Sequence, residues 1–71
     1  VMNLTPRQIW ATFRVATHYG GSFYAALGEA GLLGDPENQA RLLAAFPKLV
    51  EQYGPETAFY QRMFPTLPNG L

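Results

Sequence analysis

The 71-residue chain contains no cysteine, so it can form neither a disulfide nor a thiolate metal site. Its single histidine, His18, is too little for a histidine-based zinc site. The paired glycines Gly20 and Gly21 lack the preceding strand that a phosphate-binding loop needs. The sequence therefore predicts no metal and no cofactor. A domain this small must gain stability from dense packing or from association with a partner.

Charge is scarce and balanced, with five Lys and Arg residues against five Asp and Glu residues. Because affinity for nucleic acid depends largely on neutralising phosphates, a neutral chain is a poor candidate for nucleic-acid binding. Neutrality also removes attraction to an anionic membrane, and no apolar run approaches the length of a membrane span. No signal-peptide pattern opens the chain, so we expect a cytoplasmic protein; we interpret Val1 before Met2 as a cloning residue.

The segment from Gly34 to Gly54 carries the clearest helix signal in the sequence. Asp35 is a good N-cap, since its carboxylate can accept hydrogen bonds from the free amides of a first helical turn. Pro36 follows at the first helical position, where its missing N–H costs nothing. Gly54 closes the segment as a C-terminal stop.

Within this segment the apolar residues recur at helical spacing and form one stripe, made of Leu42, Leu43, Phe46, Leu49, Val50 and Tyr53. We expect Leu42, Phe46 and Leu49 to be core residues. Pro47 interrupts the stripe, because a proline removes a backbone hydrogen bond and clashes with the carbonyl four residues earlier. The helix therefore either kinks there, or ends and is followed by a short helix that begins at Pro47.

The sequence on either side of this segment predicts three further helices, of which the first begins near Thr5. Thr5 and Gln8 form a capping-box pattern, which predicts a helix from Pro6 to about His18 or Tyr19.

A second helix is expected to begin with Ser22 as its cap, and the small residues around Gly28 would allow a neighbouring helix to approach closely. Leu32 and Leu33 are expected in the following connection, filling the core from the turn. A last helix is expected from Pro55 and Glu56 to the residue before Pro65. These signals predict an all-α fold: one domain over residues 1–71, built as a compact bundle of four short helices with a lead-in at 1–4 and an irregular tail at 65–71.

Catalysis receives little support from the sequence. His18 lies near a predicted helix C-terminus, where a cation interacts favourably with the helix dipole, and this gives it a structural explanation. Glu51 and Glu56 could approach one another across Gly54, but we interpret them as solvated helix ends. We therefore predict no catalytic residue and a protein that is not an enzyme.

A helix-turn-helix DNA-binding regulator is the alternative that the sequence leaves open. Ala30 and Gly34 have the four-residue offset of many such motifs. The following helix would present four polar side chains to a groove, namely Glu37, Asn38, Gln39 and Arg41. Gln39 and Arg41 suit base edges, whereas Asp35 and Glu37 place negative charge where phosphate would lie.

The many aromatic residues allow two interpretations: either they all belong to the core, or they exceed what one small core can cover and form a contact surface. The run from Phe59 to Phe64 is rich in the residue types that favour interface centres. We expect Phe59 and Met63 on its inner side, with Tyr60 and Phe64 at the rim. The predicted partner-binding residues are Phe59, Tyr60, Arg62, Met63 and Phe64, together with Trp10 and Arg14 of the first helix.

Residues Leu33 to Pro47 read LGDPENQARLLAAFP, and this phrase resembles stretches in short uncharacterised helical proteins of bacteriophages and prophages. The resemblance covers about a fifth of the chain and carries no functional residues. It implies a phage-type protein in the host cytoplasm that binds and modulates a host or phage protein as a stoichiometric inhibitor or counter-defence factor. A homodimer that uses the aromatic surface is compatible with this class.

Overall fold

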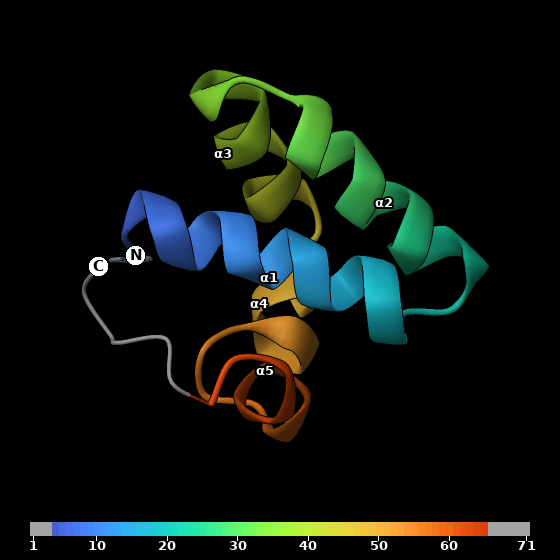
Figure 1. Cartoon of the computed structure of the whole chain (residues 1–71). Helices are drawn as coiled ribbons and strands as arrows, with labels where there is room; N and C mark the ends of the chain where they lie inside the picture. Colours follow the sequence, from blue (N-terminus) through green and yellow to red (C-terminus); the bar gives the residue numbers. More distant parts are fainter. Residues whose placement is uncertain (1–3, 66–71) are drawn as a thin grey trace.

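The computed structural model describes residues 4–65, which form α-helices and turns and contain no β-strand. The predicted lead-in and tail lie mostly outside these residues. Five helices follow one another along the chain: α1 Pro6–Tyr19, α2 Ser22–Leu33, α3 Pro36–Ala45, α4 Lys48–Tyr53 and α5 Ala58–Met63 (Figure 1). The all-α class is confirmed. The helix count differs from the expected four because the long third helix is divided in two.

Pro47 causes this division. Helix α3 ends at Ala45, Phe46 leaves the helical region at φ −128° and ψ 74°, and Pro47 is the N-cap of α4. Of the two alternatives, the break is therefore correct and the continuous kinked helix is wrong. A proline has no N–H and disfavours the helical conformation of the residue before it, which explains why Phe46 is the residue that leaves the helix.

The break changes which side chains of the apolar stripe reach the core. Leu43 and Leu49 are buried, whereas Leu42 and Phe46 are only half-buried and pack against the edge of the core. The expectation was therefore correct for Leu49 and wrong for the other two. Since α3 and α4 have separate axes, the register of one continuous helix does not describe both.

The two predicted proline-containing helix starts are present. The Thr5 hydroxyl oxygen accepts from the Gln8 backbone N–H at 3.1 Å, and the Gln8 side-chain oxygen accepts from the Thr5 N–H at 3.0 Å, which completes the capping box. Asp35 accepts from the Asn38 backbone N–H at 2.9 Å. Each of these interactions joins residues three apart, so the local sequence is sufficient to specify it.

Two other helix boundaries differ from the prediction. Helix α2 has Gly21 as its N-cap, with Ser22 as the first helical residue, and it continues through Leu33. Leu33 is consequently 85% exposed and does not fill the core. Helix α5 begins at Ala58 because Thr57, and not the Pro55–Glu56 pair, supplies the cap: its hydroxyl oxygen accepts from the Tyr60 N–H at 3.3 Å.

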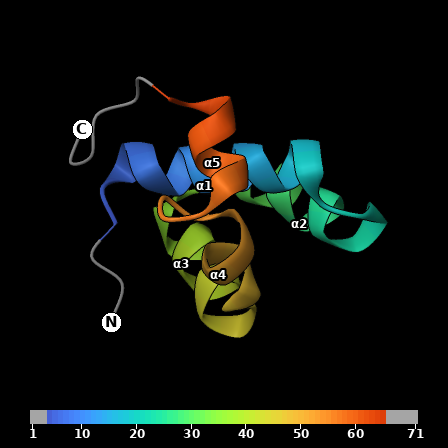
Figure 2. The same cartoon turned by 90° about the horizontal axis from the view of Figure 1, so that it is seen from below.

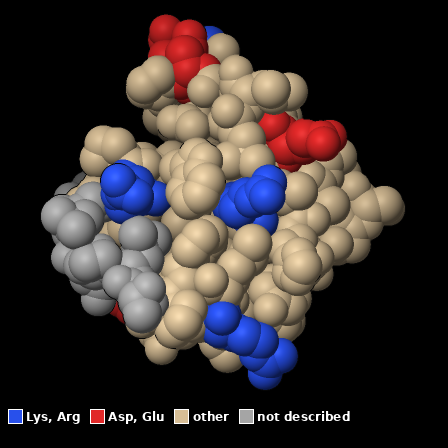
Figure 3. All heavy atoms as spheres, in the orientation of Figure 1, with Lys and Arg blue, Asp and Glu red and all other residues tan. Residues whose placement is uncertain are grey.

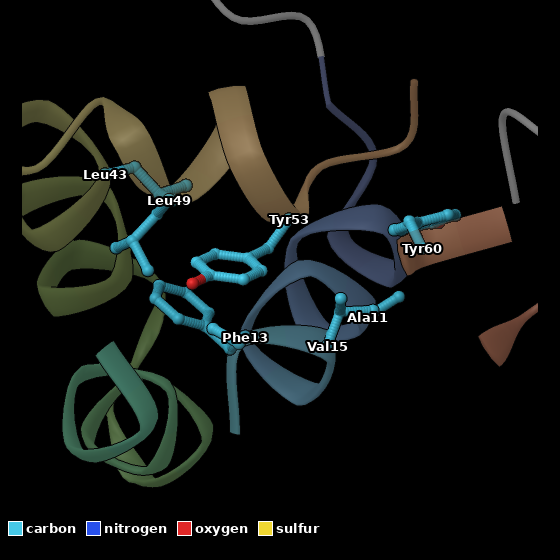
Figure 4. Packing of buried hydrophobic residues seen from close by; sticks show 8 residues of the cluster. Ala11, Phe13, Val15, Leu43, Leu49, Tyr53 and Tyr60 are labelled. Atoms are coloured by element: carbon cyan, nitrogen blue, oxygen red, sulfur yellow. The ribbon is translucent and has the colours of Figure 1, made fainter. Parts of the chain in front are cut away.

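Helix α1 is the centre of the fold and contacts α2, α4 and α5. Figure 2 shows α5 running across α1, with α3 and α4 on one side. Phe13 of α1 is fully buried, and Figure 4 shows it beside Tyr53 and Leu49 of α4. The buried apolar residues are Ala11, Phe13, Val15, Ala16, Leu43, Leu49, Tyr53 and Tyr60.

Two glycines allow α2 to approach α1 closely. A Cβ atom on Gly31 would lie 2.2 Å from the Phe13 ring, and one on Gly28 would lie 2.5 Å from the Phe13 carbonyl oxygen. Neither distance is sterically possible, so any larger residue would force the two helices apart. The predicted close approach at Gly28 is thus confirmed, and Gly31 has the same packing role against the Phe13 ring.

Candidate functional site

The charged residues are segregated although the chain as a whole is neutral. Helices α1 and α5 contain Arg7, Arg14 and Arg62 and no acidic residue. All five acidic residues lie on the other elements, namely Glu29, Asp35, Glu37, Glu51 and Glu56. Figure 3 shows basic side chains over α1 and α5 on one side of the molecule. Helices α1 and α5 are in contact, so these three basic residues lie on neighbouring helices.

An exposed tryptophan lies within this basic surface. Arg7, Trp10 and Arg14 occupy successive turns of α1, and their spacing places them on the same side of the helix. All three are exposed, Trp10 to 43%. The Trp10 ring lies 5.7 Å from the ring of Phe64, the residue that follows α5. Trp10 thus connects the two helices.

We define the α1–α5 face as the surface formed by five residues, Arg7, Trp10, Arg14, Arg62 and Phe64. None of its arginines forms an ion pair within residues 4–65, where the one ion pair joins Arg41 to Glu37 at 2.8 Å. An arginine presents several N–H donors in a planar fork and keeps its charge at all accessible pH values. The face therefore offers unpaired positive charge around an aromatic centre, which attracts anionic groups.

The predicted partner-binding residues divide into two groups. Trp10, Arg14, Arg62 and Phe64 lie on the α1–α5 face. Arg7 completes the face and was missed, although its spacing of seven residues from Arg14 and the lack of acids in this segment were visible in the sequence.

Tyr60, Phe59 and Met63 make up the second group. Tyr60 is 2% exposed and belongs to the core, and its burial raises the pKa of its hydroxyl. Phe59 is 41% exposed and stacks on Tyr19 at a ring distance of 4.4 Å, at the other end of α1 from Arg7. Met63 is half-buried against the core. The expected inner position of Phe59 and rim position of Tyr60 are therefore reversed, because α5 packs on its neighbours with Tyr60 buried and Phe59 exposed.

The two groups considered for catalysis are not among the residues of this face. His18 is exposed near the end of α1, with its ring 4.6 Å from that of Tyr19. Glu51 and Glu56 line the same hollow, of about 700 Å³, as the sequence suggested they could. Both are exposed, and the hydroxyl of Thr57 in that lining donates to the Gly54 carbonyl at 2.8 Å. Residues 4–65 contain no cluster of three His, Cys, Asp or Glu residues that could hold a metal ion.

Helix α3 uses its expected DNA-reading side chains for contacts within the protein. The Gln39 amide donates to the Gly31 carbonyl oxygen at 2.9 Å, and Arg41 donates to the Glu37 carboxylate at 2.8 Å. Asp35 keeps its negative charge at the start of the helix as the N-cap. These contacts make the polar face of α3 less suited to bases than the sequence suggested.

Comparison of the chain with protein-family models, with curated proteins and with solved structures finds no match. Within residues 4–65, no helix combines the length and the apolar character needed to cross a membrane.

Proposed function

We propose that this protein is a non-enzymatic binding protein that contacts a partner protein through the α1–α5 face. The observation that carries the proposal is the exposed Trp10, with Arg7 and Arg14 one turn away on either side and Phe64 against its ring. Tryptophan and arginine are the residue types that most often dominate the energy of protein interfaces. The Trp10 ring can bury apolar surface of the partner, and the neighbouring arginines can orient the partner by its charge.

The support beneath the face favours binding without a large entropic penalty. Helix α1 is the longest helix of the described residues, is capped at Thr5, and packs against α2, α4 and α5. The Trp10 ring is already held against Phe64. Because ordering side chains at an interface costs about 0.5–1.5 kcal/mol each, a face that is largely ordered in advance retains more of its contact energy.

We further propose the phage-type role, in which the protein modulates a host or phage protein by occupying its surface. This part of the proposal is based only on the resemblance of residues 33–47, which form the last residue of α2, the turn, α3 and the break at Pro47. It is independent of the α1–α5 face, which concerns the mode of binding.

Capture from a bacterial lysate tests the binding role. The tagged wild-type protein is compared with the variant Trp10→Ala, Arg14→Glu and with the control Phe23→Ala, Lys48→Glu, whose residues are also exposed but lie on α2 and α4. Mass spectrometry should identify a protein that the wild type and the control retain and that the first variant loses by about tenfold or more, the equivalent of 1.4 kcal/mol. Equal retention by both variants would contradict the assignment of this face.

The DNA-binding alternative makes a different prediction in the same assay. Binding of duplex DNA through α3 should weaken steeply between low and physiological salt and should be insensitive to Trp10→Ala. Capture of nucleic acid by wild type and by both variants alike would therefore favour the helix-turn-helix alternative over the proposed function.

A further inference from the structure

We propose that the α1–α5 face recognises an acidic polypeptide segment in which two carboxylates flank an apolar side chain. This inference depends on the proposed function, since it specifies the chemistry of the partner at the same face. It is argued from charge, from spacing and from the extent of the face.

Charge complementarity selects an acidic partner. The face contains Arg7, Arg14 and Arg62 without an acidic residue, while the five acids lie on other elements. An acidic segment is therefore attracted by this face more than by the other elements, which carry five acids against the two basic residues Arg41 and Lys48. Such a distribution both orients an approaching partner and disfavours binding elsewhere. A basic segment would instead be drawn toward the hollow lined by Glu51 and Glu56.

The spacing on α1 indicates how the partner's groups are arranged. Arg7 and Arg14 are seven residues apart, which at the rise of an α-helix is about 10 Å along the axis. Two carboxylates match this separation when they are about seven residues apart on a helix or about three apart on an extended strand. Trp10 lies between the two arginines, so the segment needs an apolar side chain between its acids.

The limited extent of the face favours a peptide over a nucleic acid. Its three arginines can neutralise only about three phosphates, and affinity for a polyanion increases with that number. A longer polyanion would also meet the acidic residues of the neighbouring elements. A peptide segment with a few acids can pair with the arginines in bidentate hydrogen bonds and place its apolar side chain on Trp10 and Phe64.

Trp10 provides a direct measurement, because it is the only tryptophan of the chain. The probe is a tryptophan-free, alanine-based helical peptide of about fifteen residues with glutamates at positions i and i+7 and leucine at i+3. Matched peptides replace both glutamates by glutamine or by lysine, and a single-stranded oligonucleotide serves as the competing polyanion. Each probe is titrated into the full protein while the Trp10 emission is recorded at low and physiological salt.

The glutamate peptide should shift the Trp10 emission and saturate at a Kd about tenfold or more below that of the glutamine peptide, with a difference that narrows as salt increases. The lysine peptide should give no saturable change. The variant Arg7→Gln, Arg14→Gln should lose the preference for glutamate, whereas the control Arg41→Gln on α3 should keep it.

The other outcomes separate this inference from the proposed function. If the glutamine peptide binds as tightly as the glutamate peptide, the acidic partner is wrong and the face remains a binding face. If the oligonucleotide binds more tightly than every peptide and the double variant abolishes this, both the acidic segment and the protein partner are wrong. If no probe changes the emission, the acidic segment is wrong, and the lysate capture alone then decides the proposed function.

Discussion

The α1–α5 face and the outer face of α2 both expose apolar side chains, but only the first combines them with positive charge. The outer face of α2 consists of four exposed residues on one side of the helix, Phe23, Ala26, Ala30 and Leu33. Leu33 is 85% and Phe23 56% exposed, more than the 43% of Trp10. By exposure alone, the outer face of α2 would be the stronger candidate for a binding surface.

The difference lies in charge and support. Glu29 is the one charged residue of α2, and Arg41 of α3, which lines a hollow beside Leu33, is already paired with Glu37. The outer face of α2 therefore has no arginine without an ion-pair partner within residues 4–65. Leu33 ends the helix beside an open hollow of about 620 Å³ that Leu42 and Ala45 also line. Trp10, in contrast, packs against Phe64 and lies between two arginines on α1. Isolated exposed apolar residues are common on soluble proteins, whereas charge around a supported aromatic ring provides specificity.

The largest expected effect comes from Phe13→Ala, which should abolish both faces at once. The Phe13 ring is fully buried and fills the space that Gly31 leaves between α1 and α2. Its truncation should cost about 3–5 kcal/mol, comparable to the whole stability of a small domain. Circular dichroism during thermal and urea unfolding measures this loss.

Phe46→Ala is the matched comparison. We expected Phe46 in the core, but it is half-buried and lies at the edge, with its ring 5.5 Å from that of Phe23. Its truncation should therefore cost clearly less than that of Phe13. Equal losses at the two positions would show that the core extends further toward α3 than the packing indicates.

Substitution of the two N-caps should lower the free energy of unfolding by a smaller amount. Hydrogen exchange should then show which helix, α1 or α3, each cap stabilises. Thr5→Ala and Asp35→Ala each remove a side chain that accepts from a backbone N–H, so each should cost about 1 kcal/mol. Loss of the Thr5 cap should also fray the turn that holds Arg7, and hydrogen exchange should accelerate there. Asp35→Ala should leave exchange in α1 unchanged. Faster exchange at Arg7 in both variants would mean that the start of α1 depends on α3.

The local features of the fold could be predicted because they depend on neighbours in the sequence. The caps at Thr5 and Asp35 need only a residue three positions away, and Pro47 alone determines the interruption of the third helix. Helix α2 was harder, since it is apolar nearly all round and its sequence does not show which side faces α1. The contact at Gly31 that decides this involves Phe13, which is distant in the chain.

The candidate site could be predicted only in part for the same reason. Trp10, Arg14, Arg62 and Phe64 were recognised by residue type, but local sequence patterns do not show that α1 and α5 come together. The helical wheel of α5 fixes the angles between its residues but not which one points inward. The packing of α5 against α1 and α4 decides this, and local sequence does not show that packing. The segregation of charge follows from the same contact between α1 and α5.

Tyr60 gives an effect confined to alkaline pH, which tests the support beneath the α1–α5 face. Burial raises the pKa of Tyr60 above the ordinary value of 10.0, so the folded state favours the neutral phenol. The resulting stability is present below that ordinary value and is lost as pH rises through the raised value. Between about pH 9 and pH 11 the stability of Tyr60→Phe should therefore fall less than that of the wild type.

The smallest effect on the stability of the fold is expected from a substitution at Leu33, the most exposed apolar residue of the two faces. Leu33 is 85% exposed, so Leu33→Gln should change the free energy of unfolding by less than about 0.5 kcal/mol. Trp10→Gln should lower the free energy of unfolding somewhat more, because it also removes the contact with Phe64.

The two variants should differ in their affinity for the glutamate peptide, which is measured by calorimetry because one variant lacks the tryptophan. Leu33→Gln should bind as the wild type does, and Trp10→Gln should bind about tenfold more weakly or worse. A loss of binding in Leu33→Gln with an unchanged fold would show that the outer face of α2 contacts the peptide. Charge around a braced aromatic ring would then be no better a guide to the binding surface in this protein than exposure alone.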